Sequence, residues 1–148
     1  MTYHYKLMSS AKDGGKFWEK MGPFFASEQV RREVGDYPLN DSEAMTWLVA
    51  LDKRRFEVAG FISIEAAGAR LRVRDAYVCP ESRGKGVFGE LVGKCLHYAG
   101  KQQADIVTRA PASCREVLER ARFSLVREVG KHWVDMEKKH AKGKDDAG

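Results

Sequence analysis

The chain has no run of about 18 consecutive apolar residues, which a membrane-spanning helix would need. Its first ten residues, MTYHYKLMSS, contain no apolar core of the length found in secretory signal peptides. We therefore expect a protein that neither crosses a membrane nor uses one as a partner. Because nothing in these residues marks the chain for export, we expect it to be cytoplasmic.

Cysteine is scarce, and familiar catalytic and metal-binding motifs are missing. The three cysteines, Cys79, Cys95 and Cys114, are odd in number and widely spaced, and no C-x-x-C pair occurs. This pattern favours reduced thiols over a disulfide framework. The four histidines are scattered, and neither H-E-x-x-H nor G-x-S-x-G is present. The sequence therefore predicts neither a metal site nor a serine hydrolase.

The composition is that of a globular protein with surplus positive charge. Of the 148 residues, 43% are hydrophobic and 32% are charged, and the formal net charge is +5. The length fits one domain, which we expect over residues 1–138, and the charge favours anionic partners. Residues 139–148 lack bulky apolar side chains, so we expect a disordered polar tail there.

Hydrophobic periodicity predicts a mixed order of strands and helices. Short apolar runs predict strands at residues 3–8, 45–51, 57–64, 70–78, 105–109, 125–129 and 132–136. Helical spacing predicts helices at residues 16–25, interrupted around Gly22 and Pro23, at residues 27–34 with Ser27 as the N-cap, and at residues 113–121. A long amphipathic helix is predicted from Phe88 to beyond Ala99. This order indicates a layered structure of the mixed α/β or α+β class.

The segment ESRGKGVFGELV is rich in glycine and lies between a predicted strand and the long helix. Gly84, Gly86 and Gly89 would let a ligand approach the backbone closely, and Arg83 and Lys85 add positive charge. The first turn of a helix offers unpaired N–H groups and the positive end of the helix dipole. The segment therefore predicts a phosphate or pyrophosphate site.

Two common nucleotide motifs fit this segment poorly. The glycines satisfy G-x-G-x-x-G, but the dinucleotide fingerprint needs an acidic residue about 20 positions later, at the end of the next strand. Asp105 comes too early, before its strand. The phosphate-loop pattern G-x-x-x-x-G-K-[ST] is absent. A surface loop that binds nothing is the remaining alternative.

The run RDAYVCPESRGKGVFGELVGKCLHYA resembles motif A of the GCN5-related N-acetyltransferases (GNAT), in which a strand leads through R/Q-x-x-G-x-G/A into a long helix. EVAGFISIE resembles the preceding strand of that family, and ASCREVLERARFSLVREVGKHWVDMEK resembles its closing helix and last two strands. The resemblance implies a GNAT-like mixed, mostly antiparallel central sheet of six to seven strands, flanked by about four helices.

The resemblance also implies an N-acyltransferase that uses acetyl-coenzyme A as co-substrate. In the family the glycine-rich loop binds the pyrophosphate of the cofactor, and the backbone of the preceding strand pairs with the pantetheine arm and polarises the thioester carbonyl. The residues implied in cofactor binding are Ala76, Tyr77, Val78, Arg83, Gly84, Lys85, Gly86, Val87 and Phe88.

Three positions depart from the family pattern. Phe88 stands where the motif ends in Gly or Ala, and Pro111 and Leu118 stand where the closing segment often has Asn and Tyr. The Tyr is the usual general acid for the departing thiolate, so this chain lacks it. A thiol has a pKa near 8.5, however, and its thiolate leaves tolerably near neutral pH. We expect coenzyme A binding to survive these changes.

The attacking amine still needs a base to take its proton. The candidate bases are Asp75, inside the strand before the loop, and Glu65, at the end of the preceding strand; each is also a candidate for a structural ion pair. Ser113 could assist the thiolate or cap the closing helix, and we expect Cys114 to be a packed thiol.

The acceptor is left open by the sequence. Alternation puts Arg70, Arg72 and Arg74 on one strand face, where Arg70 and Arg72 could bind an acidic acceptor or form a solvated stripe. The acceptor amine could belong to a small molecule or a macromolecule. Less favoured alternatives are a nucleic-acid-binding or DNA-base-modifying relative, and a degenerate regulator that only binds coenzyme A. The protein could be a monomer or a homodimer.

Overall fold

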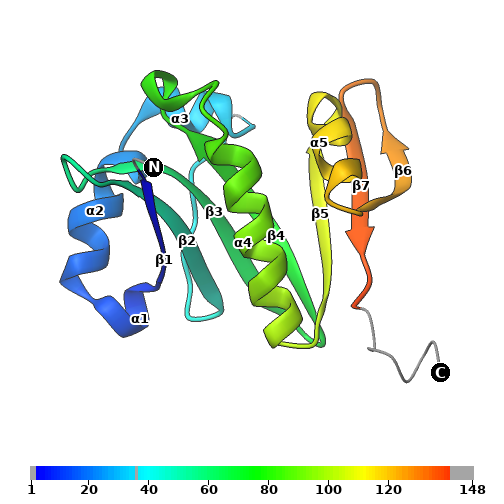
Figure 1. The fold of residues 1–148 in the computed structure, drawn as a ribbon, viewed down its shortest axis with the longest axis horizontal. Coiled ribbons are helices and arrows are strands. Elements are labelled where there is room, and N and C mark those ends of the chain that lie inside the picture. The colour runs from blue at the N-terminus through cyan, green and yellow to red at the C-terminus, as the bar shows by residue number, and fades with distance from the viewer. Residues whose placement is uncertain (1–2, 36, 141–148) are drawn as a thin grey trace.

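A single mixed sheet organises the molecule (Figure 1). The computed structural model describes residues 3–35 and 37–140. Seven strands lie in the order β1-β2-β3-β4-β5-β7-β6. Their bounds are β1 Tyr3–Met8, β2 Met45–Asp52, β3 Val58–Ala67, β4 Arg70–Val78, β5 Asp105–Pro111, β6 Ser124–Val129 and β7 Trp133–Lys138.

All neighbouring strands are antiparallel except β4 and β5, which are parallel. A parallel pair needs a long crossover connection, and here helix α4, Val87–Lys101, supplies it. The predicted fold class, a mixed and mostly antiparallel sheet of six to seven strands with flanking helices, is confirmed.

Helices cover the two faces of the sheet unequally (Figure 1). Helices α4 and α5, Arg115–Arg120, lie on one face, and a 3₁₀ turn, η2 Ala112–Cys114, leads into α5. On the other face the half formed by β1 to β4 is covered by helices near the N-terminus. These are α1 Ser10–Asp13, α2 Gly15–Phe25 and α3 Glu28–Glu33.

Each face has its own hydrophobic core. On the α4 side, Leu91 and Cys95 pack against Leu48, Ile62 and Ile106 of the sheet. Burying side chains of this size stabilises a fold by about 1.5–3 kcal/mol each. The core on the α2 side is built mainly from large side chains, Phe17, Met21, Trp47, Phe61 and Tyr77.

Two expected element boundaries are wrong, and one expected segment is mostly outside the described residues. Helix α2 runs uninterrupted through Gly22 and Pro23, because Pro23 lies near its C-terminal end and the buried Phe17 and Met21 hold it to the sheet. The closing helix begins two residues late, after the 3₁₀ turn. Of the predicted tail at 139–148, residues 141–148 lie outside the described residues, whereas the N–H of His140 donates to Asp105 Oδ1 at 2.6 Å.

A β-bulge in β4 changes which side chains face which layer. Ile62 pairs with Ala76 and Ile64 pairs with Val73, so Ser63 alone stands opposite two residues, Arg74 and Asp75. One extra residue reverses the alternation of a strand. Before the bulge Leu71 and Val73 pack on the α4 side, and after it Ala76 and Val78 do. Arg74 and Asp75 are therefore left together on the opposite face.

Across the described residues, none of the helices combines the length and the apolar character that crossing a membrane would require.

The bulge should depend on Ser63. Its hydroxyl, which is fully buried, accepts a hydrogen bond from the Asp75 N–H at 3.0 Å. Ser63→Ala leaves that N–H without its partner, so the free energy of unfolding should fall by about 1–3 kcal/mol in urea denaturation. Ser124→Ala, at an exposed position of β6, is the matched control and should change stability by less than about 0.5 kcal/mol. Equal effects in the two variants would contradict this account of the bulge.

Candidate active site

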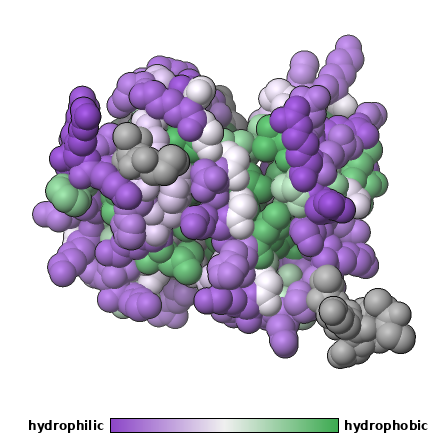
Figure 2. Space-filling view, in the orientation of Figure 1, coloured by the Kyte–Doolittle hydropathy of each residue, from purple (hydrophilic) through white to green (hydrophobic). Residues whose placement is uncertain are grey.

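A cleft opens where β4 and β5 stop pairing. Their ladder runs from the Arg70–Asp105 pair to the Val73–Thr108 pair and ends directly before the bulge. The cavity beyond it has a volume of ≈ 270 Å³ and is lined from both sides of the sheet, by residues of α4 and α5 and by residues near α3 and β7. Hydrophobic side chains are visible between the parts carrying α4 and α5 (Figure 2).

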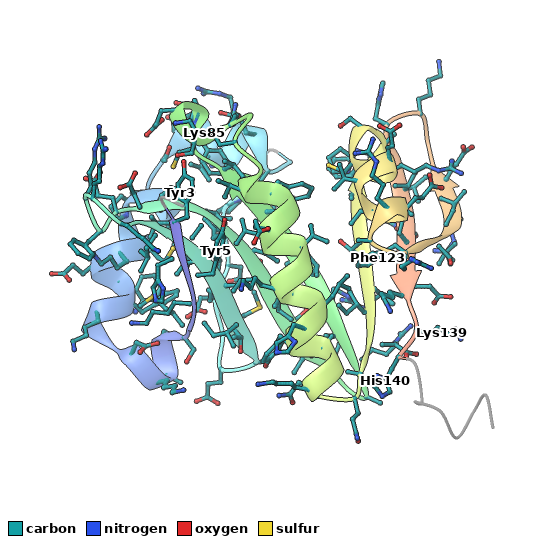
Figure 3. All side chains as sticks on the ribbon, viewed as in Figure 1. Tyr3, Tyr5, Lys85, Phe123, Lys139 and His140 are labelled. Carbon is teal, nitrogen blue, oxygen red and sulfur yellow. The ribbon has the colours of Figure 1, made fainter. Side chains whose placement is uncertain are left out.

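The glycine-rich segment forms the turn from β4 into α4. Gly84 and Gly86 have φ values of 76° and 82°, a left-handed conformation that favours glycine, and Gly86 is the N-cap of α4. Among the described residues, apart from the chain neighbours and the adjacent backbone of α4, no atom comes within 4 Å of where a Cβ would stand on Gly84, Gly86 or Gly89. The side chain of Lys85 lies at this same end of α4 (Figure 3). The segment therefore presents open backbone to an incoming anionic group.

Arg83 does not extend its side chain over this segment. Its guanidinium donates to the Val78 carbonyl at 2.8 Å and to Glu33 at 2.6 Å, and it lies 5.5 Å from the centre of the Tyr77 ring. The hydrogen bond from Gln29 and then the one from Arg83 hold the pKa of the Glu33 carboxyl below its usual value. The Arg83 side chain thus fixes the end of β4, and the expected contact of this residue with a cofactor would fall to its backbone.

The end of β4 turns backbone groups into the cleft. The N–H of Cys79 donates to Ala59 in β3, and backbone groups alternate in direction along a strand, so Val78 and Ala76 face away from β3. The Tyr77 side chain packs in the core on the α2 side. Of the three residues expected to contact a cofactor here, Ala76 offers backbone groups to the cleft and Val78 offers its N–H, because the Val78 carbonyl accepts from Arg83.

All three departures from the family pattern, Phe88, Pro111 and Leu118, line the same cleft, and Pro111 does so from the end of β5. Phe88 lies in the first turn of α4, and its half-buried side chain lines the cleft. Leu118 is buried at the cleft wall on α5, so no proton donor stands at that position. Val87 is buried in the core on the α4 side and contributes to the segment only through its backbone.

Asp75 lies in the cleft and is held by two hydrogen bonds. The Tyr37 hydroxyl donates to its Oδ1 at 2.7 Å, and its own N–H bonds to Ser63. Burial raises the pKa of the Asp75 carboxyl, while the bond from Tyr37 and the charge of Arg74 act in the opposite direction. Burial and the same hydrogen bond raise the pKa of Tyr37 to about 12.

Glu65 does not lie in the cleft. Its carboxylate is 3.1 Å from the guanidinium of Arg74 and 3.9 Å from that of Arg72. Glu65 therefore forms the structural ion pair that was one of its two expected roles. Because Glu65 lies outside the cleft, it is not placed to act as the base there.

Ser113 is exposed on the 3₁₀ turn and is not the N-cap of α5, which is Cys114, so the capping expectation is wrong. The chain enters α5 through η2, and this places Ser113 one residue too early. Cys114 is half-buried, as expected, and lines the cleft. Burial raises the pKa of its thiol, and a hydrogen bond with Ser113 lowers it in part.

A second cavity, of ≈ 750 Å³, lies on the sheet face opposite α4 and α5. We call it the arginine groove. The two spaces meet at the residues that line both of them, which are Tyr37, Val73, Arg74, Thr108, Arg109 and Trp133. The arginines that line the groove are Arg70, Arg72, Arg74, Arg109 and Arg127.

Tyr37 and Trp133 were missed at the sequence level. Tyr37 stands in DYPLNDSE, which reads as a turn-rich loop, and Trp133 reads as one apolar residue of a hairpin. The sequence carries no signal that brings them together, because the contact depends on the fold of distant segments. Within the part of the chain that the structure describes, no group of His, Cys, Asp and Glu is arranged to hold a metal ion.

The seven-stranded sheet, its cleft between two parallel strands and the glycine-rich entry to α4 define an acyltransferase fold of the N-acetyltransferase class. Residues 16–121, well over half of the chain, match the model of the Acetyltransferase (GNAT) family. The chain belongs to this family, and the resemblance noted in motif A is confirmed.

Solved structures show the same fold at low identity. The ribosomal-protein-S5-alanine acetyltransferase from Vibrio fischeri has a TM-score of 0.71 and 14% identity, covering 96% of this chain and 95% of that one. An acyl-CoA N-acyltransferase from Pseudomonas aeruginosa has a TM-score of 0.68 and 16% identity, covering 93% and 99%. The ribosomal-protein-S18-alanine N-acetyltransferase from Escherichia coli has a TM-score of 0.68 and 10% identity, covering 95% and 97%. No curated protein sequence matches the chain significantly.

The charge state of Asp75 should appear in the pH dependence of stability. Its folded pKa is raised, so its stabilising contribution is complete below the unfolded value of about 3.8 and is lost as the pH rises through the folded pKa. Asp75→Asn keeps a side-chain oxygen that can accept the hydrogen bond from Tyr37, but it does not ionise, so the variant does not lose this stability as the pH rises. The stability of the variant relative to the native protein should therefore rise between about pH 3 and pH 7 in chemical denaturation.

Asp52→Asn is a control with the opposite sign. The N–H groups of Arg54 and Arg55 hold the pKa of the Asp52 carboxyl below its usual value, so its contribution is present at neutral pH and lost in acid. The Asp52→Asn variant should therefore fall in relative stability as the pH rises. A flat difference for Asp75→Asn would contradict the buried, charge-disfavouring site described above.

Proposed function

We propose that this protein transfers an acetyl group from acetyl-coenzyme A to an amine of an acidic acceptor that binds in the arginine groove. The GNAT family supports acetyl-coenzyme A-dependent N-acetyltransfer in general, and the acceptor is the new element. The observation that carries the proposal is that the cleft and the arginine groove are joined. The cleft beside α4 and the arginine groove share Tyr37, Arg74 and Trp133, so two ligands could meet there from opposite faces.

The residues present fit the cofactor. The segment from Gly84 to Gly89 is open at each glycine, and a bulky side chain at Gly84 or Gly86 would be strained by the positive φ. The N–H groups of the first turn of α4 and the charge of Lys85 suit a pyrophosphate. Bound acetyl-coenzyme A supplies the thioester, and the cleft-facing backbone of Ala76 and Val78 would orient its pantetheine arm.

The charge of the groove favours an acidic acceptor. Arg72 and Arg74 share the single carboxylate of Glu65, and Arg109 and Arg127 share that of Asp135 at 2.7 Å each. Each pair of arginines therefore keeps about one unit of uncompensated positive charge, whereas the charge of the exposed Arg70 is offset by Glu137, which also lines the groove. Guanidinium groups bind carboxylates and phosphates with charge-assisted hydrogen bonds.

The transfer reaction does not require a strong general acid from this protein. Holding amine and thioester in line within the cleft supplies much of the acceleration, and a backbone N–H at the carbonyl oxygen supplies more. The thiolate of coenzyme A leaves without a dedicated donor at Leu118 because a thiol has a pKa near 8.5. Val73, Ala76 and Val92 line the cleft with apolar surface, which strengthens these interactions by excluding water.

Cofactor binding is tested by melting temperature. Acetyl-coenzyme A should raise it by mass action on the native state. Gly86→Val forces a branched side chain into a left-handed position and into the path of the pyrophosphate, so affinity should fall by more than about tenfold, or about 1.4 kcal/mol. Gly130→Val is the matched control, because Gly130 also has a positive φ of 61° but lies in the turn between β6 and β7. No shift in the native protein at millimolar ligand would refute the proposal.

Acceptor preference is tested with peptides that have free N-termini and are acidic, neutral or basic, together with small acidic amines. Acidic members should react best. Arg70→Ala and Arg72→Ala should each raise KM for them by about threefold to fivefold and leave kcat and cofactor affinity unchanged. Arg55→Ala, a similarly exposed arginine in the turn between β2 and β3, should change neither.

Other outcomes point elsewhere. Equal rates with acidic and basic peptides would refute the acidic acceptor. A melting shift with duplex DNA that vanishes at high salt, without one for acetyl-coenzyme A, would favour nucleic-acid binding. Tight cofactor binding without transfer to any amine would favour a regulator.

A further inference from the structure

Tyr37 is held across the junction of the cleft and the arginine groove. Gly35 has a φ of 127°, and a Cβ at that position would lie 2.6 Å from the Tyr37 ring and 3.6 Å from Trp133 of β7. Only glycine fits such a close approach. The tyrosine ring therefore lies in a closely fitted position beside the chain that leaves α3, with Trp133 nearby.

The hydroxyl of Tyr37 has one well-defined partner. It donates to Asp75 Oδ1 at 2.7 Å, and Asp75 is 6% exposed. The bulge that Ser63 holds is what turns Asp75 toward this face of the sheet, next to Arg74. The partly exposed Tyr37 side chain and the almost buried Asp75 carboxylate thus form a hydrogen-bonded pair that extends from the groove into the cleft.

We propose that Tyr37 and Asp75 act together as the base of the reaction, with Tyr37 contacting the acceptor amine and Asp75 receiving the proton. This inference rests on the proposed function. Tyr37 lines both spaces, so its side chain lies at the junction that an amine would cross on its way from the groove to a thioester in the cleft. Glu65 lies outside the cleft and Ser113 is exposed on the 3₁₀ turn, whereas Asp75 lies within the cleft.

The proton transfers balance as follows. An ammonium group gives one proton to the Tyr37 oxygen while the Tyr37 hydroxyl proton moves to Asp75 Oδ1, which leaves a neutral amine, neutral Tyr37 and protonated Asp75. The amine nitrogen then forms a bond to the thioester carbon, and the C–S bond breaks as the carbonyl re-forms. The second nitrogen proton goes to the departing sulfur. Asp75 finally releases its proton to water, so the products are amide, coenzyme A thiol and one proton.

The groups around the pair make this assignment consistent. Arg74 on β4 and Arg109 on β5 line the cleft and favour the carboxylate, and Arg74 lowers the pKa of both Asp75 and Tyr37. Glu33 on α3 also lines the cleft, but its charge is taken up by Arg83. Cys114 on η2 is a half-buried thiol with a raised pKa and brings no charge. Thr108 donates to the Val73 carbonyl and stays neutral.

The test uses the full chain, acetyl-coenzyme A and an equimolar mixture of acidic peptides with free N-termini, with release of coenzyme A thiol as the readout. Tyr37→Phe keeps the ring against Gly35 and removes the hydroxyl. It should lower kcat by at least about tenfold, and Asp75→Asn by about a hundredfold. Tyr98→Phe, which removes a hydroxyl from α4 outside the cleft, should leave kcat unchanged.

The pH profile separates a catalytic role from a structural one. The hydrogen bond from Tyr37 lowers the pKa of Asp75, so removing the hydroxyl raises that pKa and should move the acidic limb of kcat to higher pH. If Tyr37 acts through Asp75, the double variant should lose no more activity than Asp75→Asn alone.

The outcomes distinguish this inference from the proposed function. Normal cofactor binding with kcat and pH profile unchanged in Tyr37→Phe would overturn the inference and leave the transferase intact. Additive losses in the double variant would also overturn it. A native protein that binds no acetyl-coenzyme A, or that transfers to none of the peptides and none of the small acidic amines, would overturn both.

Discussion

The bulge in β4 is the constraint on which the rest of the site depends. Ser63 stands opposite Arg74 and Asp75, and the hydrogen bond from the Asp75 N–H to the Ser63 hydroxyl holds the extra residue in place. Up to this point β4 pairs with β5, and beyond it the two strands separate. A single inserted residue thus opens the cleft, places Asp75 on the face of the arginine groove and turns Ala76 and Val78 toward α4.

Much of the architecture is legible in the sequence. Period-2 alternation defines β4 as Arg70–Val78, the bounds that the structure shows, and helical spacing finds α4. The bulge escapes this kind of argument, because RLRVRDAYV alternates well enough to suggest an uninterrupted strand. Its presence depends on the partner strand, where Ser63 provides the hydroxyl that accepts from the additional N–H. The alternation of residues within one strand predicts which face of the sheet each side chain lies on, whereas the pairing register depends on both strands.

The candidate site divides in the same way. The glycine-rich segment is a local feature, and its order of strand, turn and helix distinguishes it from a dinucleotide fingerprint. Tyr37 and Trp133 are far apart in the chain and meet only in the folded protein, where Gly35 leaves room for the ring. Arg83 shows the limit of transferring a motif position by position, because its side chain fixes β4 to Glu33 instead of extending over the turn.

The short parallel ladder between β4 and β5 also has a mechanical meaning. The strand order is linear, so four residue pairs, from Arg70–Asp105 to Val73–Thr108, form the sheet's seam between the lobe of β1 to β4 and the lobe of β5 to β7. The two lobes are hydrogen-bonded to each other along this seam and diverge beyond it, so the seam can act as a hinge. The distance between the cleft walls is therefore set by the angle at the seam, and a small rotation there moves Val78 and Pro111, at the far ends of the strands, more than it moves Val73 and Thr108.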